Sequence, residues 1–182
     1  MNIEETALKG LLIIRPKVFE DDRGYFFESF NQARFKDYGL DLNFVQDNQS
    51  KSAKNVLRGL HFQNPPAAQG KLIQVIKGSV LDVAVDIRRN SKTYGQHVAV
   101  VLSEENKKMM YIPEGFAHGF LTLEDNTIFS YKCTNFYNPQ LESSLLWNDP
   151  DLNINWGVEN PTLTEKDKKA QLFRSFKSNF TI

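Results

Sequence analysis

An arginine, a histidine and a glutamine stand close together in the stretch Asn55–Gln63, whose other residues are mostly apolar and typical of a β-strand. A guanidinium and a titratable imidazole are thereby carried on a rigid element, which suits catalysis. Side chains alternate faces along a regular strand, so Arg58 and His61 should point in opposite directions. Gly59 between them predicts a β-bulge, which would turn both side chains toward one cavity.

The chain has three histidines. His118 lies in Pro113–Phe120, where a proline and two glycines predict a tight turn that delivers the imidazole at the start of a strand. A histidine at such a turn is more often a hydrogen-bonded structural residue than a catalytic one, but the presence of His61 favours a shared site. His97 is interpreted as a surface or strand-end residue and is not assigned to the site.

A mainly β fold must position these side chains. Short apolar segments separated by turn residues recur from residue 55 onward, which favours a sandwich or barrel. Two helices are expected: one begins at the N-cap Asn31 and ends near Tyr38, and the other begins at Thr162 or Thr164 and ends near Phe176. The predicted extended segments are 11–16, which is closed by Pro16, and 25–30, 44–50, 55–62, 72–77, 79–88, 96–103, 108–112, 118–123, 127–134 and 143–148.

The segment 79–88 has one apolar face and one face that carries Asp82, Ala84 and Asp86. A face with two aspartates normally contacts water, and this is the interpretation that the pattern favours. If the sheet closes into a barrel with a polar interior, Asp82 would instead line the pocket.

Length and composition narrow the class of protein. The 182 residues suffice for a single domain, 1–182, with a substantial core. Lys+Arg and Asp+Glu balance at 22 each, so we expect neither nucleic acid nor a membrane as a partner. Cys133 is the only cysteine, which excludes an intramolecular disulfide and fits a reducing compartment. The apolar run Leu11–Ile14 is too short for a signal peptide or a membrane span, so a cytoplasmic location is expected.

The segment around His118 resembles the second motif of the cupin superfamily, Pro-x-Gly-x-x-His, through Pro113, Gly115 and His118. Many cupins bind a metal with that histidine, a His-x-His pair and a glutamate. The corresponding pair here is His61-Phe62-Gln63, in which glutamine replaces the second histidine. Two imidazoles without a third nitrogen or a placed carboxylate form a poor transition-metal site, so no metal is expected.

A closer resemblance is to the dTDP-4-dehydrorhamnose 3,5-epimerase family, and it covers the chain from about Gly10 to the final helix. It implies a cupin-type double-stranded β-helix, that is, a jelly-roll barrel, with short N-terminal and C-terminal helices. It also implies a metal-free and cofactor-free enzyme, a dTDP-4-keto-6-deoxyhexose substrate and a homodimer. The motifs that carry it are Val56–Gln63, Gln69–Lys71, Asp82–Arg88, Pro113–Phe120, Tyr131–Lys132 and Leu146–Asp149.

Epimerisation next to a ketone requires a base on one face of the sugar, a group that holds the enolate oxygen, and an acid on the other face. Histidine titrates near neutral pH, which makes His61 the candidate base. By resemblance, Asp167 orients His61, Lys71 holds the enolate and Tyr131 is the acid. Without the resemblance, Asp167 would be interpreted as a solvated helix carboxylate, Lys71 as a surface residue and Tyr131 as a core residue.

The resemblance also predicts the residues that bind the substrate. Arg23, Arg58 and Lys166 match positions that hold the pyrophosphate, for which forked guanidinium groups are well suited. His118 is expected to contact the sugar. Further substrate contacts are expected from Glu28, Gln46, Asp47, Asn48 and Glu142.

Three alternatives remain open at the level of sequence. The enzyme could invert a single carbon of a nucleotide sugar, at C3 or at C5. It could be a metal-dependent cupin oxygenase, which the broken metal motif disfavours. It could also be a module that binds a sugar nucleotide without catalysis, which the presence of His61, Lys71 and Tyr131 disfavours.

Overall fold

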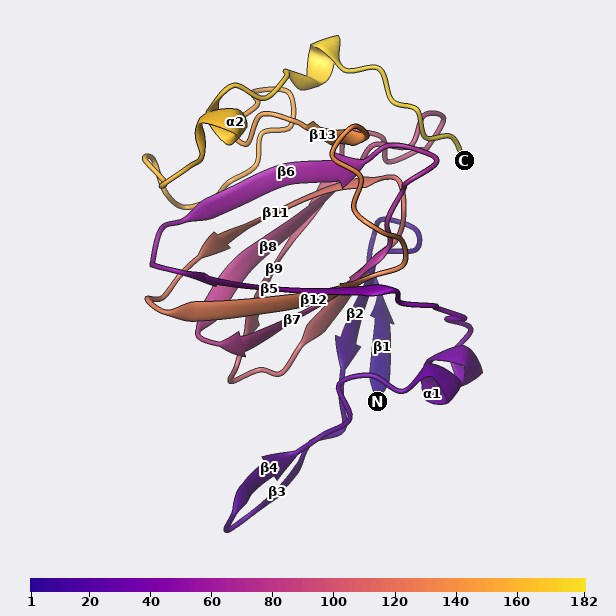
Figure 1. The fold of residues 1–182 in the computed structure, drawn as a ribbon, viewed down its shortest axis with the longest axis vertical. Helices are drawn as coiled ribbons and strands as arrows, with labels where there is room; N and C mark the ends of the chain where they lie inside the picture. Colours follow the sequence, from indigo (N-terminus) through magenta and orange to yellow (C-terminus); the bar gives the residue numbers. More distant parts are fainter.

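The computed structural model describes residues 1–182, and it is built mainly from antiparallel strands in two sheets (Figure 1). The six-stranded sheet contains, in spatial order, β1 (Asn2–Glu5), β2 (Leu12–Arg15), β10 (Met109–Ile112), β7 (Lys71–Lys77), β12 (Thr127–Cys133) and β5 (Gln46–Ser52). The five-stranded sheet contains β13 (Glu142–Ser144), β6 (Leu57–Gln63), β11 (Phe116–Thr122), β8 (Ser79–Asp86) and β9 (His97–Ser103). Consecutive strands such as β6 and β7 lie in different sheets, so the chain crosses repeatedly between them, as in a jelly-roll barrel. The predicted fold class is confirmed.

Three apolar clusters hold these layers together. A cluster of 13 buried residues joins the facing sides of the two sheets, for example through Phe129 on β12 and Phe120 on β11. Another 13 buried residues lie on the opposite side of the five-stranded sheet, where Val83 shares a cluster with Trp156 of the C-terminal segment. The helix α1 (Gln32–Asp37) packs Phe35 into a third cluster against the six-stranded sheet. The C-terminal segment therefore covers one side of the barrel, as Figure 1 shows above β6.

The predicted bulge at Gly59 is confirmed. His61 lies opposite His118 and Arg58 lies opposite Phe120, so β6 contains one residue more than β11 between the two pairs. Gly59 adopts a φ of +131°, and a Cβ atom there would lie 2.4 Å from the Cα atom of Gly119. Only glycine fits such a conformation against a neighbouring backbone. The bulge places Arg58 and His61 on the wall of the same cavity.

The expectation that the aspartate face of 79–88 contacts water is wrong. Asp82 and Asp86 are both fully buried, and Ala84 between them belongs to the cluster between the sheets. The apolar face that carries Val83 and Val85 is buried as well, beneath the C-terminal segment. Alternation along a strand shows which residues share a face, but both faces of β8 are enclosed here.

The prediction of one long C-terminal helix is also wrong. The structure has one helical turn, α2 (Glu165–Lys168), and a separate 3₁₀ turn, η1 (Phe173–Ser175). The backbone of Gln171 between them accepts a hydrogen bond from the Leu146 N–H and forms a β-bridge with Leu145. Gln171 therefore pairs with the edge of the sheet and does not continue the helix. The strand β13 ends at Ser144, short of the predicted 143–148.

A short hairpin of β3 (Phe19–Asp21) and β4 (Gly24–Phe26) replaces most of the strand predicted at 25–30. It projects away from the barrel (Figure 1), and its aromatic residues are exposed: Phe19 by 53%, Tyr25 by 55% and Phe26 by 66%. No helix in the structure has the length and apolar character needed to span a bilayer.

Candidate active site

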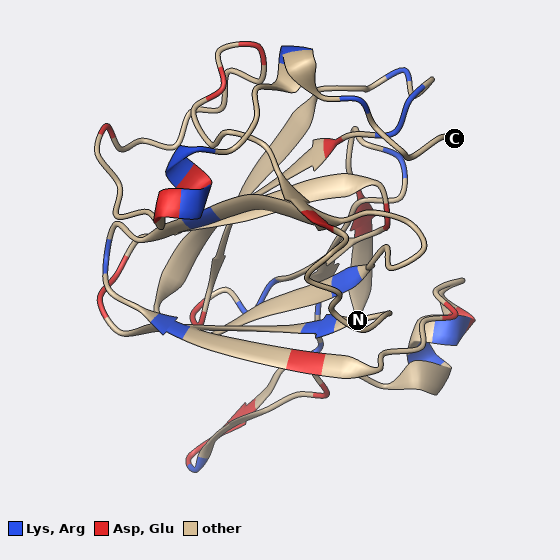
Figure 2. Cartoon of the chain, turned by 45° about the horizontal axis from the view of Figure 1, so that its top comes forward, with Lys and Arg blue, Asp and Glu red and all other residues tan.

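A cavity of about 390 Å³ lies between the two sheets, within the size range of small-molecule sites. A second hollow of about 200 Å³ shares Asn48, His61, Lys71 and Tyr131 with it, so the two are lobes of one site. The charged helix α2 lies against β6 at this site (Figure 2). The main lobe is lined by Asn48, Gln49, Ser50, Arg58, His61, Lys71, His118, Phe120, Tyr131, Thr164, Lys166 and Asp167.

The structure brings His61 and Asp167 together, although 106 positions separate them in the sequence. Nε2 of His61 lies 2.5 Å from Oδ1 of Asp167. Thr164, the N-cap of α2, accepts a hydrogen bond of 3.2 Å from the Asp167 backbone N–H and so fixes the carboxylate. Burial raises the pKa of Asp167, but the hydrogen bond and charge of His61, with hydrogen bonds from Thr164 and the Gly59 backbone, together lower the pKa below its usual value. An ionised carboxylate therefore faces Nε2, and Nδ1 is left for another partner.

His118 makes a similar contact deeper in the barrel. Its Nε2 lies 3.0 Å from Oδ1 and 3.1 Å from Oδ2 of Asp82, on the neighbouring strand β8. Burial lowers the pKa of His118, and the carboxylate of Asp82 only partly opposes this effect. The neutral imidazole lies beside the stacked pair of Phe120 and Phe129, whose ring centroids are 6.3 and 6.1 Å away.

Lys71 and Tyr131 face the cavity from the six-stranded sheet, opposite His61. The Lys71 Nζ lies 5.8 Å from the centroid of the Tyr131 ring, and no ion pair or side-chain hydrogen bond engages it. Burial lowers the pKa of Lys71, and the acidic groups of Cys133, Asp82 and Glu142 oppose this shift when they are ionised. Burial raises the pKa of Tyr131, so the phenol keeps its proton at neutral pH.

Several predicted binding residues also reach the site. Arg58 is held by hydrogen bonds of 3.3 and 3.2 Å to the Ser52 hydroxyl, and Asn48 and Lys166 line the same lobe. The second lobe contains Gln46 and Glu142. The Glu142 carboxylate accepts a hydrogen bond from the Tyr137 hydroxyl at 2.8 Å and pairs with Lys166, so it ties α2 to the rim of the cavity.

Three predicted binding residues do not reach the cavity of their own chain. Arg23 is at the tip of the projecting hairpin and pairs with Asp21. Glu28 pairs with Arg34 of α1. Asp47 pairs with Lys132 on the outer face of its sheet, because its neighbours Gln46 and Asn48 occupy the inward positions of β5.

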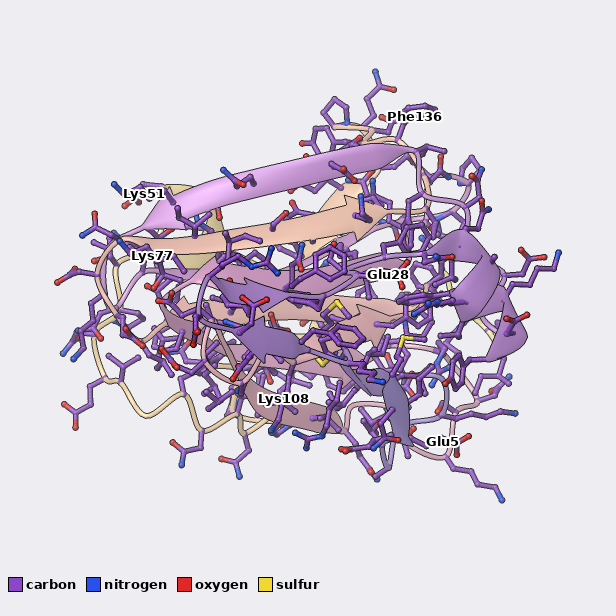
Figure 3. All side chains as sticks on the ribbon, turned by 90° about the horizontal axis from the view of Figure 1, so that it is seen from below. Glu5, Glu28, Lys51, Lys77, Lys108 and Phe136 are labelled. Atoms are coloured by element: carbon purple, nitrogen blue, oxygen red, sulfur yellow. The ribbon has the colours of Figure 1, made fainter.

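Some residues that line the cavity were not predicted from the sequence. Ser50 follows Gln46 and Asn48 at the strand period of two, and that spacing could have identified it. Its hydroxyl oxygen is the one buried side-chain N or O atom without a hydrogen-bond partner. Tyr137, in a loop at the rim, carries no such signal. Its neighbour Phe136 is 65% exposed and lies at the end of β5 opposite Lys51 (Figure 3).

The donor atoms of the site do not form a metal-binding set. No group of three His, Cys, Asp or Glu side chains in the structure is placed to hold an ion. Gln63, at the position of the second histidine in the cupin motif, is buried and accepts a hydrogen bond of 2.9 Å from the Asn138 backbone. The Nε2 atoms of His61 and His118 each face a carboxylate.

The antiparallel jelly-roll barrel and its interior cavity define a cupin-type protein with an acid–base site. The sequence profile of the family described as dTDP-4-dehydrorhamnose 3,5-epimerase matches residues 5–175. The chain belongs to this family, whose members are isomerases of dTDP-sugars.

Individual relatives agree with this assignment. A dTDP-4-dehydrorhamnose 3,5-epimerase from Shigella flexneri is 53% identical over 174 residues, which is 95% of this chain and 96% of the relative. The structure of a dTDP-6-deoxy-D-glucose-3,5-epimerase from Legionella pneumophila in complex with dTDP-4-keto-L-rhamnose is 48% identical, with a TM-score of 0.93 over 97% of this chain and 94% of the other. A 3'-monoepimerase from Streptomyces bikiniensis in complex with dTDP-quinovose is 31% identical, with a TM-score of 0.86 over 92% and 85%.

Proposed function

We propose that the protein converts dTDP-4-dehydro-6-deoxy-D-glucose to dTDP-4-dehydro-L-rhamnose by inverting C3 and C5. Support comes from the family and from the similar Legionella enzyme, which binds dTDP-4-keto-L-rhamnose. Substrate and product are isomers, so the reaction transfers no net electrons. Proton removal and return at two carbons suffice, because the C4 ketone acidifies the hydrogens on both neighbouring carbons.

One observation carries the proposal: His61 and Tyr131 line the same cavity from opposite sheets, with Lys71 beside Tyr131. In this arrangement His61 removes the proton from one face of the sugar. Asp167 is a positioning residue that holds the Nε2–H of His61 and stabilises the imidazolium after proton transfer.

Lys71 and Tyr131 complete the proton transfer. The Lys71 ammonium donates to the C4 oxygen as negative charge develops there, and a buried cation aimed at an enolate is often a large catalytic term. Tyr131 then returns a proton to the opposite face. Its raised pKa keeps it protonated until the carbanion needs the proton.

The same cavity provides an anchor for the nucleotide. Arg58 and Lys166 are cations on its wall and suit the pyrophosphate. We assign His118 to the sugar. Asn48 at the junction of the lobes, with Gln46 and Glu142 in the second lobe, is assigned to the remainder of the nucleotide.

We also propose a homodimer in which the hairpin enters the site of the partner. Arg23 and Glu28 match substrate-binding positions of the family, yet they lie outside the cavity of their own chain. The exposed aromatic residues of the hairpin favour burial against another surface. In this arrangement Arg23 adds a third guanidinium or ammonium group near the pyrophosphate.

Mixed dimers test this arrangement. Arg23→Ala and His61→Ala protomers are each defective alone. A mixed dimer regains one intact site, because His61 of one protomer meets the partner subunit's Arg23. Activity at low substrate concentration should therefore rise on mixing above the sum of the two variants. No rise after verified subunit exchange would contradict the crossed hairpin, and sedimentation gives the oligomeric state directly.

The reaction is tested by incubation with dTDP-4-keto-6-deoxyglucose in deuterated water, followed by proton NMR. Label at C3 and C5 is expected. Label at one carbon would establish inversion of a single centre, which is the activity of the similar 3'-monoepimerase. Binding without label would leave a sugar-nucleotide binding module. Activity that depends on added transition metal and on oxygen would identify an oxygenase.

Finally, we propose that residues 1–182 act as one epimerase domain in the cytoplasm, without nucleic acid or a membrane as partner. The family match over 5–175 supports one domain. The single cysteine, buried in β12, fits a reducing compartment.

A further inference from the structure

Asp82 is a buried carboxylate for which the proposed reaction has no role so far. It is fully buried on β8 and is not among the residues that line the cavity. Its only hydrogen-bond partner is Nε2 of His118, which lies about equally far from both carboxylate oxygens, at 3.0 and 3.1 Å. A carboxylate taken out of water is costly unless it is hydrogen-bonded and its charge is balanced.

The contact with Asp82 determines what His118 offers to a ligand. Since burial keeps the imidazole neutral, it carries one hydrogen, and the carboxylate requires that hydrogen on Nε2. Nδ1 is then a hydrogen-bond acceptor, and no group of the protein engages it. His118 lines the cavity, so it presents a lone pair to a sugar hydroxyl or to an ammonium group.

Asp82 is hydrogen-bonded to His118, which lines the same cavity as Lys71, so the carboxylate lies one side chain behind the cavity wall. Lys71 must be an ammonium to hold an enolate. Burial works against that charge, and the opposing groups are Cys133, Asp82 and Glu142. Burial raises the pKa of the Cys133 thiol, so it is uncharged at neutral pH. Glu142 is already paired with Lys166. Asp82 is thus the remaining anion whose charge no lysine or arginine balances at ion-pair distance.

We propose, on the basis of the function proposed above, that Asp82 is a positioning residue that keeps Lys71 an ammonium and His118 an acceptor toward the cavity. The carboxylate acts from beneath the site without touching substrate. Other titratable groups that face Lys71 from the surrounding strands are His61 on β6, His118 on β11, Tyr131 and Cys133 on β12 and Glu142 on β13.

The test is Asp82→Asn in the full chain. The carboxamide oxygen still accepts the Nε2–H of His118, so the variant removes the charge and retains the hydrogen bond. Loss of the charge lowers the pKa of Lys71. The alkaline limb of the kcat profile should therefore move to lower pH by about one unit, the lower end of the shift that an opposite charge causes. An unmoved limb overturns the proposal.

A matched control comes from the same strand. Asp86 is equally buried, but its partners are Arg88, Ser91 and Thr93, outside the cavity. Asp86→Asn should lower stability and leave the alkaline limb in place. An equal shift in both variants would show a general effect of lost charge and would also overturn the proposal.

A second readout needs no substrate. Competitive acetylation of the intact protein, followed by mass spectrometry of the peptide that contains Lys71, reports the titration of this one amine. The midpoint should fall by about one pH unit in Asp82→Asn and stay in place in His118→Gln, which retains the carboxylate. A midpoint unchanged in Asp82→Asn, or lowered equally in His118→Gln, refutes the role of Asp82. Failure of the epimerase assay alone refutes only the proposed function.

Discussion

Two histidines with the same type of hydrogen-bond partner lie directly opposite each other on β6 and β11. Each one faces a buried carboxylate through Nε2, His61 with Asp167 and His118 with Asp82. The exposed fractions of the side chains differ, at 32% for His61 and 6% for His118. The supports differ as well, because Asp167 is on a single helical turn and Asp82 is on a strand paired with β11.

In the proposed mechanism this difference separates His61, the base, from His118, a fixed hydrogen-bond acceptor. His61 meets solvent and cavity, so its imidazolium can be hydrated and stabilised by Asp167 after it takes a proton. A charge on His118 would be desolvated, and burial accordingly lowers its pKa. In the proposed mechanism the same pair of residue types therefore serves proton transfer on β6 and rigid positioning on the neighbouring strand β11.

The largest loss of activity should come from replacing His61, the more exposed of the two histidines. His61→Asn removes the base, and the rate of deuterium incorporation should fall by about 10² to 10⁴. His118→Asn removes a hydrogen-bond acceptor, and its rate should fall only about tenfold, the equivalent of one hydrogen bond. Both rates are measured by NMR at saturating substrate. Equal losses in the two variants would mean that exposure does not divide their roles.

Asp167→Asn should have the next largest effect. The amide cannot stabilise an imidazolium on His61, so kcat should fall about 10²-fold, the lower end for an acid–base group, with a smaller change in KM. Glu165 is on the same helical turn but is exposed and pairs with Lys168, so Glu165→Gln is a matched control that should keep full activity. Steady-state kinetics of the two variants decide the point, and a loss confined to KM would assign Asp167 to binding instead.

Local spacing was sufficient to predict the position of His61. A glycine between Arg58 and His61 predicts a bulge, and the bulge brings both side chains to one wall. The partner of His61 could not be derived in the same way. Asp167 comes from a segment more than one hundred positions away, and only the resemblance to a family predicted their contact.

The burial of Asp82, the partner of His118, depends on tertiary structure that no local pattern encodes. Alternation on β8 placed Asp82 and Asp86 on one face, but the closure of the barrel decides that this face is buried. The C-terminal residues likewise have helical spacing, yet the backbone of Gln171 pairs with the sheet edge near Leu145. In both places long-range contacts outweigh the local signal.

A third buried carboxylate, Asp86, has no histidine as a hydrogen-bond partner. Asp86 accepts hydrogen bonds from Arg88, Ser91 and Thr93. Burial raises its pKa, but these bonds lower it to about 2. A lowered pKa stabilises the fold above the unfolded value near 4, and this stabilisation is lost as pH falls from about 4 to about 2.

The contribution of Asp86 should be about 2 kcal/mol, since each pKa unit corresponds to about 1.4 kcal/mol. Urea unfolding of the natural protein and of Asp86→Asn should give a difference in free energy that is largest near pH 6 and shrinks by this amount toward pH 2. A difference that does not depend on pH would mean that hydrogen bonding, and not charge, stabilises this part of β8.

The smallest effect should come from Thr164, which supports only one of the two pairs. Thr164→Ala removes the cap that bonds the Asp167 backbone and should weaken α2 by about 1 kcal/mol. Since Asp82 is held by a strand, the loosening reaches His61 and not His118. We expect kcat to fall less than tenfold, while the alkaline limb assigned to Lys71 stays in place. Thr164→Ser retains the hydroxyl oxygen and should restore kcat. A loss as large as that of Asp167→Asn would mean that the helical turn exists only through its cap, and that the support of His61 is far weaker than its short hydrogen bond implies.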